Sequence, residues 1–306
     1  GNLLFGGQTS ARMREITPDD LILGVLPMTH VFGLTSMMLA GLIAGAELRL
    51  APRFSAGDVL DALVSDMQAQ QPDHVAVTGD LVNLALDAEF NPARQWLEGV
   101  GDPADVTVVP GNHDAYVRAT RHRFVSHFGD YLRGDADGAA SHFPFVRRRG
   151  PVALIGVSSA VPTPPLMATG WLGHAQLNAL DTILGQLSRE DAFRVLLVHH
   201  PLHSDGRAKR LTDSHQLLAL LKRHGVELVL HGHDHIHSTM WFDGPERKIP
   251  AIGVPSASAL ARKHYPAAAY NLFSIERDGN AWRCEQIVRG LGDHDGIREL
   301  KQVRLS

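Results

Sequence analysis

Four short motifs collect most of the residue types in this chain that can bind metal ions. They are TGDLVN at 78–83, GNHD at 111–114, VHHP at 198–201 and HGHDHIH at 231–237. Each ends a short apolar run, and together they supply carboxylate, amide and imidazole side chains. Such mixed ligands suit one or more divalent cations of hard or borderline character. The motifs therefore predict a metal centre that is assembled from distant parts of the chain.

The first two motifs contain residues for which two roles are open. Asp80 follows a glycine, and its carboxylate could bridge two cations or, as the alternative, cap the next turn or helix. Asn112 offers a neutral amide oxygen to a cation, and His113 beside it is placed to donate a proton to a leaving group. Asp114 is then expected to hold the His113 ring in orientation. The alternative for Gly-Asn-His-Asp is a turn with a helix cap.

Histidines are concentrated in the last two motifs. Adjacent residues of a strand point to opposite faces, so we expect one of His199 and His200 to bind metal, and we assign His199. His233 and His235 are two residues apart, which in an extended segment places both rings on one face, although a solvated loop is the alternative. Two further histidines of the same parity are expected to pack in the interior or lie at the rim: His231 and His237.

Alternating strands and helices are expected to position these motifs. Buried strands are predicted at 73–78, 106–110, 152–157, 194–198, 227–231, 249–254, 271–276 and 282–288. Helices are predicted at 59–70, 90–100, 173–188 and 212–224. This alternation indicates an α/β fold with a mainly parallel sheet covered on both faces, and the last three strands predict a second, partly antiparallel sheet. All four motifs fall at strand carboxyl ends, where such folds form their ligand crevice.

Composition excludes several classes of protein. Of the 306 residues, 44% are apolar and 20% are charged, which argues against disorder. A net charge of −4 argues against nucleic acid as the main partner. The single Cys284 excludes an intrachain disulfide and a zinc site with several cysteines, and it fits a reducing compartment. No signal peptide is evident, so we expect a cytoplasmic protein.

The segment Leu21 to Ala46 contains no charged residue and is long enough to raise the question of a membrane span. Pro27, His30 and four glycines interrupt it, however, and flanking aromatic anchors are missing. A buried strand followed by a buried helix is therefore expected, and no membrane span. In another part of the chain, the run Arg147 to Arg149 could line an anionic entrance, but a solvated basic turn is expected.

Taken together, the motifs GD, GNHD, HHP and GHDH resemble the calcineurin-like metallophosphoesterase superfamily over about residues 57 to 300. The stretches FPFVRRRGPVALIGVSSAVPTPP and VPSASA resemble its bacterial branch related to cyclic-nucleotide phosphodiesterases. The resemblance implies a four-layer αββα fold, in which a sandwich of two sheets is flanked by helices. It also implies a metal-dependent hydrolase of small-molecule phosphoesters, with diesters favoured over monoesters.

The resemblance also implies a two-metal site. Asp80 would bridge the two ions, Asn112, His199 and His233 would complete one of them, and His235 would belong to the other. The ligand set suits manganese, iron or zinc. In such a site a bridging hydroxide would attack phosphorus in line while both cations neutralise the phosphate oxygens.

One element of the family pattern is missing. The family opens with an Asp-x-His motif that supplies the remaining ligands of one metal, and no Asp upstream of Asp80 is followed two residues later by His. The nearest stand-in is Met28-Thr29-His30, in which His30 could contribute a ligand. The protein is thus expected to bind one or two divalent ions, with activity reduced by the loss. The alternative is a non-catalytic metal-binding remnant of such an enzyme.

The first sixty residues resemble a different family. The segment GNLLFGGQTS onward, and LPMTHVFGL above all, is similar to an internal stretch of adenylate-forming acyl-CoA synthetases. The phosphate loop of that family is absent, and sixty residues bury too little core to hold a two-substrate site, so ligase activity is not expected. The predicted organisation is an atypical N-terminal segment, 1–56, followed by a metallophosphoesterase domain, 57–306.

Overall fold

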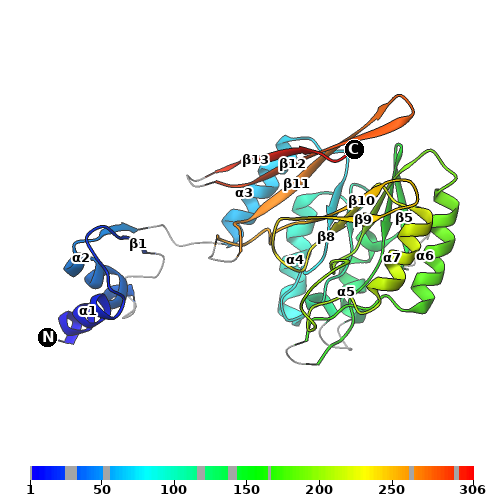
Figure 1. Cartoon of the computed structure of the whole chain (residues 1–306). Coiled ribbons are helices and arrows are strands. Elements are labelled where there is room, and N and C mark those ends of the chain that lie inside the picture. Colours follow the sequence, from blue (N-terminus) through cyan, green and yellow to red (C-terminus); the bar gives the residue numbers. More distant parts are fainter. Residues whose placement is uncertain are drawn as a thin grey trace. The chain divides into compact units, whose positions relative to one another are not determined.

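The computed structural model describes residues 2–24, 33–50, 56–115, 121–136, 143–164, 167–261, 265–292 and 296–306. The chain divides into two compact units, Gly1–Val59 and Leu60–Ser306, of which the second contains all four motifs. Figure 1 shows the elements of both units along the chain. The division falls within helix α3 (Ala56–Ala69), and the organisation into an atypical segment, 1–56, and a metallophosphoesterase domain, 57–306, stays a prediction.

The first unit consists of small elements with little core between them. They are α1 (Asn2–Met13), β1 (Leu21–Gly24), a π-helical turn (Gly33–Leu39), α2 (Ala40–Ala44) and β2 (Glu47–Leu50), with β1 parallel to β2. The expected burial of this segment is met only in part where the structure describes it, since Ala40 is fully buried whereas Leu21 is 53% and Leu42 62% exposed. So small a unit buries few large side chains. His30 lies outside the described residues.

The same segment is long and uncharged enough in sequence to raise the question of a membrane span. Among the helices that the structure describes, none is long and apolar enough to cross a membrane. The π-helical turn and α2 cover Gly33–Ala44, and they are followed directly by Gly45 in a left-handed conformation with a φ of 74°. A left-handed residue ends a helix, and glycine takes this position because a residue with a Cβ rarely adopts such a φ.

A six-stranded mixed sheet forms the centre of the second unit. Its strands are β5 (Phe145–Arg149), β6 (Val152–Gly156), β7 (Phe193–Leu197), β8 (Leu228–His231), β9 (Ser238–Asp243) and β10 (Lys248–Gly253). The order across the sheet is β5-β6-β7-β8-β10-β9, with β6, β7, β8 and β10 parallel and an antiparallel strand at each edge. The central strands are almost entirely buried and apolar, as a sheet covered on both faces requires.

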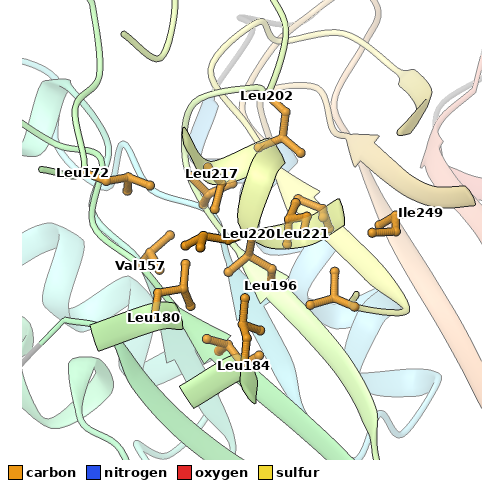
Figure 2. Close-up of a cluster of buried hydrophobic side chains, with 14 of the residues drawn as sticks. Val157, Leu172, Leu180, Leu184, Leu196, Leu202, Leu217, Leu220, Leu221 and Ile249 are labelled. Atoms are coloured by element: carbon orange, nitrogen blue, oxygen red, sulfur yellow. The ribbon is translucent and has the colours of Figure 1, made fainter. Parts of the chain in front are cut away.

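Two helices cover one face of this sheet. They are α6 (His174–Leu187) and α7 (Ser214–His224), which turn their apolar stripes toward the strands. Figure 2 shows the resulting core, in which leucines of both helices meet Val157, Leu196 and Ile249 of the sheet layer. Burial of this kind contributes about 1.5–3 kcal/mol for each large apolar side chain.

A second layer of strands packs on the other face. It consists of the parallel pair β3 (Val75–Val77) and β4 (Val106–Val108) and the antiparallel sheet β11 (Ala269–Asp278), β12 (Ala281–Leu291) and β13 (Ile297–Arg304). The core between the two layers combines residues of both: Leu154, Phe193, Val195 and Leu197 with Phe273, Trp282 and Cys284. Helices α3, α4 (Asp87–Val100) and α5 (Arg121–Phe128) pack behind β3 and β4. The predicted αββα sandwich is confirmed.

Some elements differ from those predicted. The strand predicted at 249–254 belongs to the central sheet as β10, so the last three predicted strands do not form one sheet. The third strand beside β11 and β12 is β13, which was not predicted. Its sequence, IRELKQVR, is largely exposed and charged, so it lacks the apolar pattern of a buried strand. Strands β5 and β9 were missed for a similar reason, because both are edge strands with exposed polar positions.

The predicted solvated basic turn is wrong for Arg147, which is only 4% exposed. Burial lowers the pKa of its guanidinium to about 10. The guanidinium donates to four backbone oxygens, those of Arg133 at 2.5 Å, Pro103 at 2.6 Å, Val106 at 2.7 Å and Asp130 at 2.9 Å. The other two arginines of the run form ion pairs, Arg148 with Glu190 and Arg149 with Asp135. The run therefore binds neighbouring loops together.

Candidate metal centre

The four motifs lie at the carboxyl ends of four parallel strands in two packed layers. β3 leads to Asp80 and its neighbour β4 leads to Asn112, while β7 leads to His199 and its neighbour β8 leads to His233. Within each pair the strand ends lie side by side, because the two strands are in parallel register. The side chains of His199 and Asn112 are in contact across the two layers, although the two residues are 87 positions apart in sequence.

Four side chains converge here, and we call Asp80, Asn112, His199 and His233 the donor quartet. His199 Nε2 lies 3.3 Å from Asp80 Oδ2 and 3.1 Å from Asn112 Oδ1. His233 Nδ1 lies 2.9 Å from Asn112 Oδ1 and 3.3 Å from His199 Nε2. Asn112, His199 and His233 are buried, and the Asp80 side chain is 16% exposed. The structure thus brings together four of the five predicted metal ligands.

Hydrogen bonding determines which nitrogen of His199 carries its proton. Nδ1 lies 2.6 Å from the carbonyl oxygen of Thr78, and a carbonyl can only accept, so Nδ1 is the donor. In the neutral ring, Nε2 then presents a lone pair to the oxygens of Asp80 and Asn112. Atoms whose lone pairs face one another in this way require a cation between them, either a proton or a metal ion. An imidazole fixed through its second nitrogen is also the usual arrangement of a metal-binding histidine.

The charges around the quartet agree with this requirement. Burial opposes ionisation of Asp80, but His199 and His113 outweigh it and lower the pKa of the carboxyl. For His199 the same burial would lower the pKa, and the Asp80 carboxylate outweighs it and raises the pKa instead. The site is therefore built around an ionised Asp80 with positive charge beside it.

The donor chemistry of the quartet fits one divalent cation. Among the described residues, no group of three or more His, Cys, Asp and Glu side chains is placed as the ligands of a metal ion. Asp80, His199 and His233 alone therefore do not make such a group, and the contact between the two imidazoles and the oxygen of Asp80 is completed by the amide oxygen of Asn112, which lies 3.1 Å from His199 Nε2 and 2.9 Å from His233 Nδ1. Ligands about 2.0–2.3 Å from one ion are themselves about 3 Å apart. The contacts of 2.9–3.3 Å within the quartet match that spacing. In the described part of the chain, no hydrogen-bond partner lies at the buried Nε2 of His233, the nitrogen that is not in contact with the other three side chains.

The backbone around the quartet is strained and tightly packed. Asp80, His233 and His235 have positive φ values of 59°, 69° and 55°, which cost of order 1 kcal/mol each in residues other than glycine. A Cβ on Gly111 would lie 2.7 Å from the backbone nitrogen of Asp80 and closer still to its carboxylate. A Cβ on Gly79 would lie 2.7 Å from His199 Nδ1. These glycines permit the close approach of the strand ends on which the quartet depends.

The expectation that Asp114 orients the His113 ring is wrong. The buried Asp114 carboxylate accepts three backbone N–H groups, from Asp80 and Gly111 at 2.8 Å and from Val82 at 3.1 Å. It therefore binds the Asp80 loop to the Gly111 loop. Burial and the nearby charge of Asp80 raise its pKa to about 7. Both oxygens of Asp114 thus face backbone N–H groups of the two loops, and the His113 ring has its partner elsewhere.

His113 is held by the Asp80 loop instead. Its ring nitrogen Nδ1 donates to the carbonyl oxygen of Asn83 at 2.6 Å, and its backbone N–H donates to Asp80 Oδ1 at 2.9 Å. The ring is half-buried, and its charge is felt at Asp80. His113 is thus beside the quartet without being one of the four converging donors.

The other histidines of the motifs have different surroundings. His200 is completely buried, with Nδ1 2.7 Å from Ser159 Oγ and Nε2 3.1 Å from the carbonyl oxygen of Ala168. Both nitrogens are engaged, so His200 packs behind the quartet, with its ring centroid 4.4 Å from that of His233. Ser159 and the carbonyl of Ala168 were not foreseen, because nothing in their local sequence marks them as partners of a histidine 41 and 32 residues away.

His235 does not join the quartet. It is exposed, and its ring centroid lies 6.5 Å from that of Tyr265. Its membership of a second metal site stays a prediction. His231 is buried beside Ser238, and His237 is exposed, in agreement with the packing and rim positions expected for them.

The fold and this arrangement define an α/β protein whose strand ends present a polar, metal-compatible centre, as in metal-dependent hydrolases. Residues 55–237 match the calcineurin-like phosphoesterase family, and the chain belongs to it.

Two curated relatives are phosphodiesterases. A probable cyclic nucleotide phosphodiesterase of a Synechococcus species is 25% identical over 229 residues, which cover 73% of this chain and 80% of the relative. The glycerophosphodiester phosphodiesterase GpdQ of Enterobacter lignolyticus is 26% identical over 227 residues, covering 70% of this chain and 75% of the relative. Among solved structures, a dimetal phosphatase of Danio rerio matches with a TM-score of 0.57 at 14% identity, covering 83% of this chain and 90% of that one. This last likeness concerns the fold alone.

Proposed function

We propose that this protein is a metal-dependent phosphodiesterase acting on small-molecule phosphoesters. The observation that carries the proposal is the convergence of the donor quartet, with His199 fixed in the tautomer that presents Nε2. Family membership and two phosphodiesterase relatives support the class of reaction. Asp80, Asn112, His199 and His233 would hold one divalent ion, and manganese, iron or zinc suits this ligand set.

The residues of the chain have distinct tasks in this proposal. A bound divalent cation would supply neutralisation of the phosphate charge and a nucleophile from water at neutral pH. Asp114 keeps the loops of Asp80 and Gly111 together, which maintains the spacing of the donors. His113 already donates through Nδ1 to a carbonyl, so only Nε2 of its imidazolium form can protonate a leaving alkoxide.

The completeness of the second metal position separates two versions of the proposal. The quartet lacks the ligands of the missing Asp-x-His motif, and His235 is exposed and apart from the four donors. These observations favour a single tightly held ion, and a non-catalytic metal-binding protein is the second candidate. Electrostatic stabilisation of the transition state is usually the largest catalytic factor, so the loss of one cation costs about 100-fold or more in rate.

The decisive experiment measures Mn²⁺-dependent hydrolysis of bis(4-nitrophenyl) phosphate together with Mn²⁺ binding. Asn112→Ala removes the central oxygen of the quartet, and we expect turnover to fall about 100-fold or more. Asn91→Ala, at an exposed position of α4, is the matched control and should leave turnover unchanged. Mn²⁺ binding that depends on Asn112 without any hydrolysis would support the non-catalytic candidate. Hydrolysis that is unaffected by Asn112→Ala would refute the proposed centre.

A further inference from the structure

The two histidines of the quartet are oriented in different ways. His199 is fixed by the hydrogen bond of 2.6 Å from its Nδ1 to the carbonyl oxygen of Thr78. His233 turns Nδ1 toward Asn112 Oδ1 and His199 Nε2, and within the described ranges its buried Nε2 has no hydrogen-bond partner. A metal-binding imidazole is usually held by a hydrogen bond at its second nitrogen. The His233 ring therefore depends on packing for its orientation.

The His200 ring packs against the His233 ring. Their centroids are 4.4 Å apart, with the planes inclined at 41°, and the centroids of His200 and His199 are 5.0 Å apart. Each of the three rings lies against the other two, since the centroids of His199 and His233 are 5.1 Å apart. His200 has no exposed surface, so contacts within the protein determine its position.

Hydrogen bonds at both nitrogens fix the His200 ring. The carbonyl oxygen of Ala168 can only accept, so Nε2, which lies 3.1 Å away, carries a proton. In the neutral ring, Nδ1 then presents a lone pair, and the Ser159 hydroxyl at 2.7 Å donates to it. Ser159 Oγ also accepts the backbone N–H of His200 at 3.4 Å, which fixes the direction of the hydroxyl. The ring is thus held on both sides in one tautomer.

The acceptor of the His200 proton is itself held in place. Ala168 begins a short segment that ends at Gly173. At one end, the N–H of Ala168 donates to the carbonyl oxygen of Ala208 at 2.8 Å. At the other end, the buried carboxylate of Asp213 accepts backbone N–H groups of the segment at 2.8–3.1 Å. The fold therefore fixes the carbonyl that orients the His200 ring.

We propose that His200 is a positioning residue of the metal centre, which keeps His233 Nδ1 directed at the other three donors, and that Ser159 holds His200 for this task. The inference rests on the proposed function and adds two residues that act on the ion through His233. Packing alone does not explain a histidine at this position. An apolar side chain would fill the space but would leave the carbonyl of Ala168 and the hydroxyl of Ser159 buried without their partner.

The test measures binding of Mn²⁺ to the full chain by isothermal titration calorimetry. Ser159→Ala removes the hydroxyl that fixes His200 and leaves all four donors unchanged, so Mn²⁺ should bind about three- to tenfold more weakly. His200→Leu removes the ring, and the expected loss of affinity is about 10- to 100-fold. Ser158→Ala is the matched control and should leave the affinity unchanged, because Ser158 binds Gln176 through its backbone, at 2.8 and 2.9 Å.

The visible absorption of bound Co²⁺ provides a readout that a loss of stability alone does not change. The position and intensity of its bands depend on the geometry of the ligands. Both Ser159→Ala and His200→Leu should alter the spectrum, and Ser158→Ala should not. Thermal unfolding without metal establishes that each variant is folded, and Ser159→Ala carries the test if His200→Leu does not fold.

The outcomes separate this inference from the proposed function. An unchanged Mn²⁺ affinity or an unchanged Co²⁺ spectrum in folded Ser159→Ala would overturn the inference, and hydrolysis of bis(4-nitrophenyl) phosphate by the same protein would leave the proposed function in place. Weaker Mn²⁺ binding with an altered Co²⁺ spectrum, in a protein that hydrolyses no ester, would support the positioning role and refute the proposed enzyme. No Mn²⁺ binding by the unsubstituted protein would overturn both.

Discussion

The substitution Gly111→Ala tests the candidate centre through a single methyl group. The added Cβ would lie 2.7 Å from the backbone nitrogen of Asp80 and 2.7 Å from Cε1 of His199, and closer still to the Asp80 carboxylate. Non-bonded carbon contacts are about 3.5 Å or more, so both neighbours must move by about 0.8 Å. The backbone of Gly111 has no positive φ, so an alanine is acceptable there apart from these collisions.

Two consequences follow from that displacement. Overpacking of this kind costs about 1–3 kcal/mol of stability, because a backbone atom and a buried ring are both in the way. The movement also separates Asp80 from His199, which lie 3.3 Å apart. Displacing metal ligands in this way typically reduces affinity about 10- to 100-fold, which is about 1.4–2.7 kcal/mol of binding free energy.

Thermal unfolding with and without Mn²⁺ measures this loss. Binding to the folded state stabilises a protein in proportion to the logarithm of ligand concentration over Kd. For a unit of this size, the predicted loss of affinity reduces the Mn²⁺-induced rise in Tm by about 3–10 °C. Isothermal titration calorimetry with Mn²⁺ gives the Kd of the same variant directly.

Gly99→Ala is the matched control for this substitution. Gly99 lies in α4, and a Cβ there would meet no atom within 4 Å. Alanine should be neutral or stabilise the helix by up to about 1 kcal/mol, and the effect of Mn²⁺ should not change. A Gly111→Ala protein that binds Mn²⁺ as tightly as Gly99→Ala would show that the metal does not bind between Asp80 and His199.

Two further predictions concern stability. Arg147→Met should lower the free energy of unfolding in urea by about 3–5 kcal/mol, because it leaves four backbone oxygens without their buried donor; Arg148→Met, which breaks a surface pair, should cost less than about 1 kcal/mol. Burial, with Arg149 and Arg147, lowers the pKa of His74 to about 4, so His74 stays neutral in the folded protein while the unfolded chain binds a proton below about 6.5. The stability that depends on this neutral ring is present above pH 6.5 and is lost as the pH falls to 4. Between pH 7 and pH 4, the free energy of unfolding in urea should therefore fall by about 1–2 kcal/mol less in His74→Asn than in the unsubstituted protein. This figure allows for the partial exposure of the ring.

Each stability prediction has an outcome that contradicts it. Equal losses in Arg147→Met and Arg148→Met would mean that the buried guanidinium contributes no more than a surface arginine. An unchanged pH profile in His74→Asn would mean that His74 takes up its proton at a similar pH in both states. The hydrogen bond of 2.6 Å between His74 Nε2 and Thr107 Oγ1 would then be formed by the charged ring as well.

Much of the fold follows from local sequence. The apolar runs that end in Asp80, Asn112 and His199 predict β3, β4 and β7 to within a few residues, since burial on both faces of a sheet demands such runs. The charged strand β13 was not predictable, because it forms by pairing with β12 and buries little. Sheet membership was not predictable either, because β10 and β11 follow each other in sequence but belong to different sheets.

By itself, the sequence determined the donor types, their placement at strand ends and the family. The tertiary structure decided their partners: Thr78 fixes the His199 tautomer, Asp114 binds two loops in place of an imidazole, and His200 packs behind the quartet. The physical reason is distance along the chain. A strand and the turn after it are set by a few neighbouring residues, whereas the contacts of His199 with Thr78 and of His233 with Asn112 each join residues 121 positions apart. Contacts of that separation exist only after the two sheets have packed against each other.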